Sequence, residues 1–322
     1  MECKKTLLRR GFALWLLLSV GAAPGQAYPD RPVKIIVPFA PAGLTDVIAR
    51  IVADKFSVNF GERFYVENRG GASGNTGTAA AAAAPPDGYT LLITASGLVV
   101  NPSLFVNVPY DAVKDFAPIS LIAVSPNVIS VHPSVPAQSV KELITLIKAN
   151  PGKYTYATAG HLTGDMFRVS QGLVLPPVRF SSAGPALQST VGGHTPIAIT
   201  ALAPATPLIK EGKLRGLMVT SAKRVRTLPE VPTAAEAGLA GQEIYTLTGL
   251  LAPTGTSQAI IDLLHAEIVK IVAMPDIQSR LDDLGFEVVA SSPDEFAARI
   301  KAELEWWAKA VRAAKIKPED SQ

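Results

Sequence analysis

Apolar segments with the composition of β-strands alternate with helical patterns along most of this chain. We read strands at 33–39, 64–68 and 89–95, a helix from about Thr45, and an alanine-rich helix around 79–84. Such alternation is typical of α/β proteins whose sheets are mainly parallel. The chain has 322 residues, a length at which one hydrophobic core commonly divides into two. The sequence therefore predicts an α/β fold with two cores.

The first 27 residues have the pattern of an export signal. A basic segment at 1–10 leads into an apolar stretch at 12–20, and small residues follow up to Ala27, just before Tyr28. About nine apolar residues are too few to cross a bilayer, which requires ~20. We expect cleavage near Ala27 and a periplasmic protein. The pair Arg9-Arg10 also resembles a twin-arginine signal, so both the general secretory and the twin-arginine route stay open.

The charge is carried by that segment. Lys+Arg number 30 and Asp+Glu 27, a net charge of +3, and residues 1–27 hold four of the basic residues and one acidic residue. The remainder is predicted to be neutral, which argues against a nucleic-acid partner. The one cysteine, Cys3, lies within the signal, so we expect no disulfide and no thiol chemistry in the exported chain.

Two glycine-containing loops each follow a predicted strand and each begin a helix. They are Ala42-Gly43-Leu44-Thr45 and Ser73-Gly74-Asn75-Thr76. A helix N-terminus presents unpaired N–H groups and partial positive charge, so two such ends are suited to an anion without any Lys or Arg. Ordinary connections between strand and helix have the same composition, and the loops alone leave that alternative open.

Motifs for catalysis or for metal binding are missing from the sequence. No G-x-S-x-G turn and no phosphate-binding loop occurs, and the four histidines do not form a metal-ligand spacing. We therefore expect neither an enzyme, nor a metal site, nor a cofactor. His161, in a predicted loop, is the one histidine that we keep as a candidate for a binding site.

A set of further motifs runs in order along the chain: Tyr28–Pro32, Pro38–Asp46, Glu67–Gly77, Pro85–Leu92, Pro109–Ser120, Gly212–Arg215, Val219–Arg224, Leu228–Thr233 and Ala252–Thr256. Taken together, these segments resemble the Bug receptors, the periplasmic substrate-binding proteins of tripartite tricarboxylate transporters.

The resemblance implies a type II periplasmic binding protein, with two α/β lobes, two crossing strands and a ligand cleft between the lobes. We expect the first lobe at 28–127 and 248–322 and the second lobe at 128–247. It also implies a small carboxylate as ligand and two integral membrane subunits of the transporter as partners. We expect the receptor itself to be a monomer.

The family's ligand loops correspond to the two glycine-containing loops, and further polar positions face them from the second lobe. The expected ligand-binding residues are Phe39, Pro41, Ala42, Gly43, Thr45, Asp46, Ser73, Gly74, Asn75, Thr76, Ser96, Thr158, Ala159, Gly160, His161, Thr163, Ser181, Ser182 and Thr200. The sequence departs from the family where Phe180-Ser181-Ser182 replaces the usual Tyr-Lys-Gly and removes a cation. The loop before Thr163 is also shorter than usual.

We conclude that the sequence predicts a receptor that closes over a mono- or dicarboxylate, aliphatic or aromatic, by hinge bending, and delivers it to a transporter. A receptor that presents its closed form to a signalling partner would have the same fold and cleft. A secreted hydrolase is the third alternative, for which the sequence contains no nucleophile–base motif.

Overall fold

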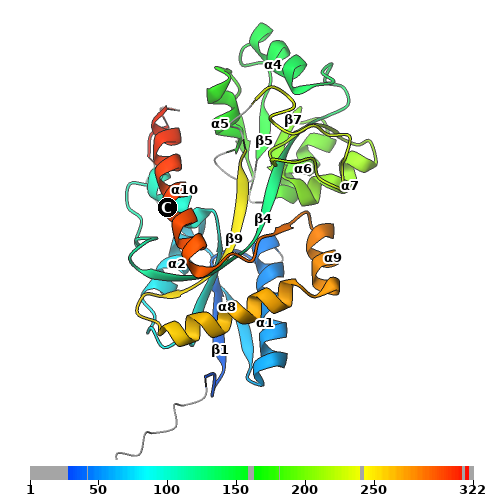
Figure 1. The fold of residues 1–322 in the computed structure, drawn as a ribbon. Coiled ribbons are helices and arrows are strands. Elements are labelled where there is room, and N and C mark those ends of the chain that lie inside the picture. Colours follow the sequence, from blue (N-terminus) through cyan, green and yellow to red (C-terminus); the bar gives the residue numbers. More distant parts are fainter. Residues whose placement is uncertain are drawn as a thin grey trace, which may run out of the picture.

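The computed structural model describes residues 28–41, 43–158, 163–180, 182–239, 243–313 and 316–318. The expected export signal at 1–27 lies outside this part of the chain. The described residues fold into two α/β lobes that β4 and β9 connect (Figure 1). The predicted two-lobe architecture is confirmed.

The first lobe begins with alternating strands and helices, as the sequence predicts. Its elements are β1 (Val33–Val37), α1 (Leu44–Phe60), β2 (Phe64–Asn68), the 3-10 turn η1 (Ala72–Gly74), α2 (Asn75–Ala82), β3 (Thr90–Ala95) and α3 (Gly97–Leu104). Strand β1 pairs in parallel with both β2 and β3. The carboxyl ends of these strands therefore meet at one edge of the sheet, and α1, η1 and α3 begin there.

The long strand β4 (Phe116–Val131) belongs to both lobes. From Phe116 to Pro126 it pairs antiparallel with β9 (Tyr245–Pro253), which also pairs with β3. From Asn127 onward it pairs with β7 and β8 of the second lobe. Figure 1 shows β4 and β9 side by side between the lobes. The change of partner at Pro126–Asn127 marks where the chain passes between the lobes.

The second lobe repeats the same construction on a smaller scale. Its elements are α4 (Val140–Ala149), β5 (Tyr156–Thr158), α5 (Thr163–Ser170), β6 (Pro177–Arg179), α6 (Ala183–Val191), β7 (Ile197–Ala201), α7 (Leu202–Lys210) and β8 (Arg215–Val219). Strand β5 lies between β6 and β7 and is parallel to both.

The chain then returns to the first lobe and ends in helices. These elements are α8 (Gln258–Val272), α9 (Pro275–Asp283), β10 (Glu287–Val288) and α10 (Pro293–Ala313). The predicted capping box at the start of α10 is present: Glu295 N donates to Ser292 Oγ (3.2 Å), and Ser292 N donates to Glu295 Oε2 (2.8 Å). None of the described helices is long and apolar enough to cross a membrane.

Each lobe has buried cores on both faces of its sheet. In the first lobe one cluster joins α1 and α8 to the sheet, and a second joins α3 and α10 to the opposite face. The predicted apolar stripe of α10 lies in the second cluster, where Phe296, Ile300 and Trp307 are buried. Two smaller clusters hold the second lobe together. This packing fixes the strand ends that face the gap between the lobes.

Candidate functional site

A cavity of about 540 Å³ lies between the two lobes and is lined by residues from both. A volume of this size accommodates a small organic ligand. The expected site residues that line it are Phe39, Ser73, Ser96, Thr158, Thr163 and Thr200. The cavity thus brings together residues from strand ends and helix starts that are far apart in the sequence.

The loop of Ser73 has an unusual backbone. Ala72 (φ 46°), Ser73 (φ 57°) and Gly74 (φ 93°) all have backbone conformations in the left-handed region, which residues other than glycine rarely adopt. A neighbouring side chain holds the loop in place: Asn101 Nδ2 of α3 donates to Ser73 O (3.1 Å) and to Asn75 Oδ1 (2.7 Å). Strained backbone of this kind is typical of functional sites.

Helix α3 is the third helix that begins at the end of a strand in the first lobe. Ser96 and Gly97, where it begins, line the cavity. The hydroxyl of Ser96 accepts a hydrogen bond from Leu247 N of β9 (2.9 Å), so α3 begins at the point where β9 enters the first lobe. The first N–H groups of a helix have no partner within the helix. A ligand anion in this cavity therefore has a partially positive helix end beside it.

The second lobe contributes Thr158, Thr163 and Thr200, and a buried ionic network positions the first two. Asp165 of α5 pairs with Arg168 Nε (2.8 Å) and Arg179 Nη2 (3.3 Å), and Tyr156 OH donates to it (3.1 Å). Burial and the carboxylate raise the pKa of Tyr156, so the phenol stays a proton donor. The network ties β5, α5 and β6 together and so places Thr158 and Thr163 at the cavity.

The remaining expected residues have other positions. Pro41, Gly43, Thr45, Asp46, Gly74, Asn75, Thr76 and Ser182 are outside the cavity lining. Asp46 is 2% exposed, and its carboxylate pairs with Arg50 Nε (2.9 Å) and accepts a hydrogen bond from Asn68 Nδ2 (2.8 Å). Its position fits a structural role at the start of α1. Ala42, Ala159, Gly160, His161 and Ser181 lie outside the described residues.

The described residues that line the cavity are uncharged. Within the described part of the chain the lining contains hydroxyl, amide and apolar side chains, but no Lys, Arg, His, Asp or Glu. Nor do the described residues contain a group of three or more His, Cys, Asp or Glu able to hold a metal ion. The arrangement is suited to binding through hydrogen bonds and apolar contact.

Several lining residues were missed at the sequence level. They include Val100, Asn101 and Leu104 of α3, Asn127 of β4, Tyr245 and Thr246 of β9, and Trp307 of α10. Trp307 is buried, as its helical stripe predicts, but it also borders the cavity. One signal was available, because Ser96-Gly97 after the predicted strand at 89–95 repeats the pattern of the two glycine-containing loops.

Known proteins resemble this chain along most of its length. A model of the tripartite tricarboxylate transporter family receptors matches residues 48–316. BugT of Bordetella pertussis (strain Tohama I) is 34% identical over 307 residues, which cover 92% of this chain and 94% of BugT.

Solved structures give the same result. An R. palustris protein with adipate has a TM-score of 0.83 and 32% identity, over 91% of this chain and 100% of that one. MatC from Rhodopseudomonas palustris with bound malate has a TM-score of 0.80 and 30% identity, over 88% of this chain and 100% of MatC. These matches confirm the predicted periplasmic-binding-protein fold, in a family of binding proteins rather than enzymes. The chain belongs to the receptor family of the tripartite tricarboxylate transporters, whose members are periplasmic solute-binding proteins.

Proposed function

We propose that this protein captures a small carboxylate between its lobes by hinge closure and delivers it to the membrane part of a tripartite tricarboxylate transporter. The observation that carries the proposal is the cavity to which both lobes contribute polar side chains, and whose described lining residues carry no charge. The ligands of the two similar proteins, adipate and malate, are small carboxylates and support this class of ligand.

Hydrogen bonds, rather than a cation, would hold the carboxylate. Ser73 and Ser96 of the first lobe and Thr158, Thr163 and Thr200 of the second lobe supply hydroxyls, and the start of α3 supplies N–H groups. Hydrogen bonds to an ionised acceptor are about twice as strong as neutral ones. A ligand that bridges both lobes in this way stabilises the closed arrangement over the open one, which is how binding drives closure.

The division into lobes at 28–127 with 248–322, and at 128–247, remains part of this proposal. The exchange of partners along β4 between Pro126 and Asn127 supports the first boundary. The antiparallel pairing of Tyr245 with Pro126 supports a second boundary close to the start of β9.

We further propose the cellular setting that the family implies. The segment 1–27 directs export and is removed near Ala27, by the general secretory or the twin-arginine route. The exported protein acts as a monomer and meets the two integral membrane subunits with its lobes closed.

Calorimetry with a panel of aliphatic and aromatic mono- and dicarboxylates, beside glucose and lysine, tests the ligand class. We expect at least one carboxylate to bind, and binding of only the sugar or the amino acid would overturn the proposal. Thr158→Val removes a hydroxyl at nearly constant shape and should weaken carboxylate binding about tenfold. Thr145→Val is the control, because its hydroxyl lies on α4 and donates to Lys141 O (3.0 Å). The proposed role of Thr158 fails if both variants bind like the wild type.

A further inference from the structure

The cavity runs along α3 and changes character from one end of this helix to the other. Ser96 and Gly97 line it at the start of α3, and Leu104 lines it at the end. Leu104 lies seven helical steps beyond Gly97, a rise of about 10 Å. Asn101, in the middle of α3, donates to Ser73 O (3.1 Å), and a Cβ on Gly97 would lie 3.5 Å from the same oxygen. Ser73 and Ser96 therefore lie near the beginning of α3, and Asn101 lies further along it.

The other end of the cavity is apolar. Val100, Leu104, Ile244 and Trp307 all line it, and all four belong to one buried cluster in which each is at most 6% exposed. Val100 and Leu104 are four residues apart and so lie on the same face of α3. A ligand that extends from the start of α3 toward its end meets apolar side chains of this cluster.

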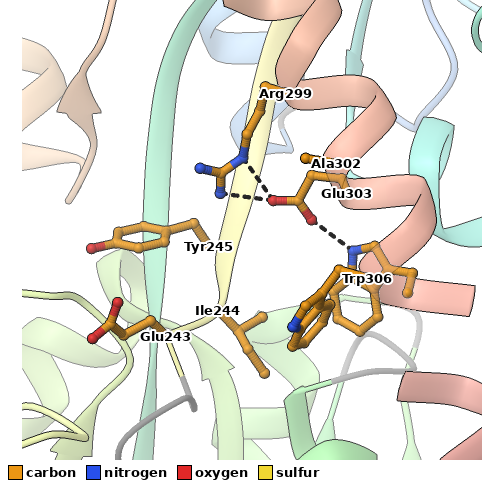
Figure 2. A pocket seen from close by; sticks show the side chains of 8 residues that line it. Glu243, Ile244, Tyr245, Arg299, Ala302, Glu303 and Trp306 are labelled. Carbon is orange, nitrogen blue, oxygen red and sulfur yellow. Dashed lines mark hydrogen bonds and ion pairs between the residues drawn. The ribbon is translucent and has the colours of Figure 1, made fainter. Parts of the chain in front are cut away.

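The orientation of Trp307 within that cluster is fixed. Its Nε1 donates to Glu303 Oε2 (2.9 Å), and Arg299 holds the same carboxylate through Nη2 (2.7 Å). Figure 2 shows this Arg299–Glu303 pair in a smaller neighbouring cavity, which Trp306 also lines. Trp306 is absent from the lining of the larger cavity. Both tryptophans line the smaller cavity and their ring centroids are 4.4 Å apart, but of the two only Trp307 borders the larger cavity.

From this polarity we infer that the preferred ligand has one carboxylate and an apolar tail, and that Leu104 and Trp307 contact the tail. The inference rests on the proposed function and specifies its ligand. A second carboxylate beside Leu104 and Trp307 would lose its hydration with no cation among the described lining residues to compensate, which is costly. A methylene chain at the same place gains about 0.8 kcal/mol per buried CH₂, or about fourfold in affinity. This preference would distinguish the chain from the similar proteins with adipate and malate.

Calorimetry with propionate, butyrate, pentanoate, hexanoate, adipate and hexan-1-ol separates the outcomes. We expect affinity to rise up to about fourfold with each added methylene, and hexanoate to bind at least tenfold more tightly than adipate. Adipate binding as tightly as hexanoate, or more tightly, would overturn the inference and leave the proposed function intact. Hexan-1-ol binding as well as hexanoate, or no acid binding at all, would instead overturn the proposed function.

Two variants test the named residues. Trp307→Ala should weaken hexanoate about tenfold and propionate less than twofold, whereas the control Trp306→Ala should bind both like the wild type. Leu104→Lys places an ammonium group at the apolar end and should raise the affinity for adipate relative to hexanoate at least tenfold. A damaged fold cannot produce that gain, so the second variant decides if the first one fails to fold. An unchanged ratio in the folded lysine variant would remove Leu104 from the ligand's tail site.

Discussion

At the scale of single residues, Gly77 shows how closely the candidate site is packed. A Cβ at this position would lie 2.8 Å from Pro38 Cα and closer still to Arg69 O, and both of these atoms belong to backbone that cannot easily move. We expect Gly77→Ala to lower the free energy of unfolding by about 2 kcal/mol, because overpacking of this kind typically costs 1–3 kcal/mol. Urea denaturation measures the change. The control is Gly184→Ala in α6, where a Cβ would meet nothing within 4 Å. Equal stability of the two variants would contradict the close packing.

Individual site residues could be predicted only in part. Ser73 and Thr158 were identified because they stand at strand ends, which is where ligands bind in α/β sheets. In the first loop, Phe39 lines the cavity, whereas Gly43 has φ −75°, which any residue adopts, and lies outside the cavity lining, so its contact with the ligand stays a prediction. Sequence patterns locate the edge of a sheet, but the direction of each loop depends on contacts such as Asn101 with Ser73 O, which no local pattern encodes.

At the scale of elements, the network around Asp165 assembles one wall of the cavity. This carboxylate is 3% exposed and joins α5 to β5 and β6. We expect Asp165→Asn to lower the free energy of unfolding by about 2 kcal/mol. This loss is smaller than the loss from breaking a fully buried ion pair, because Arg168 and Arg179 are partly exposed. Carboxylate binding should weaken as well, since Thr158 and Thr163 lose their support. The matched control is Glu211→Gln, whose partner Lys213 is about half exposed, and it should cost less than about 0.5 kcal/mol. A stability change in Asp165→Asn as small as the control's would show that the network is dispensable.

The elements themselves were largely predictable, and the reasons are local. Apolar runs, the alanine-rich segment and the capping box at Ser292 specify their strands and helices independently of the rest of the chain. The role of α10 was not predictable in this way. Its apolar stripe indicates a buried face, but whether Trp307 borders core or cavity depends on where α3 and β9 lie in space.

At the scale of the whole molecule, the lobes also meet on the far side of the connecting strands. Asn127 lines the ligand cavity, whereas the preceding residue, Pro126, lines a second crevice of about 400 Å³. Successive residues of a strand face opposite sides, so the two spaces lie on opposite sides of β4. Across the crevice, Arg226 Nη2 of the second lobe pairs with Asp282 Oδ2 of α9 (2.6 Å). The closure that we propose, by bending at Pro126–Asn127, would widen the crevice and separate the pair.

The ion pair behind the hinge should therefore oppose ligand binding. Asp282→Asn destabilises the form of the protein in which this ion pair is intact. A larger fraction of the molecules can then close, and the apparent affinity for the ligand rises. An exposed pair contributes 0.2–1 kcal/mol, which limits the gain to about fivefold. Calorimetry at low salt, with a carboxylate that the wild type binds, measures it. Arg224→Gln is the control, because its partner Glu236 lies in the same lobe (2.8 Å) and closure leaves that pair unchanged. Weaker binding by Asp282→Asn, or an equal gain in both variants, would show that the pair does not separate when the lobes close.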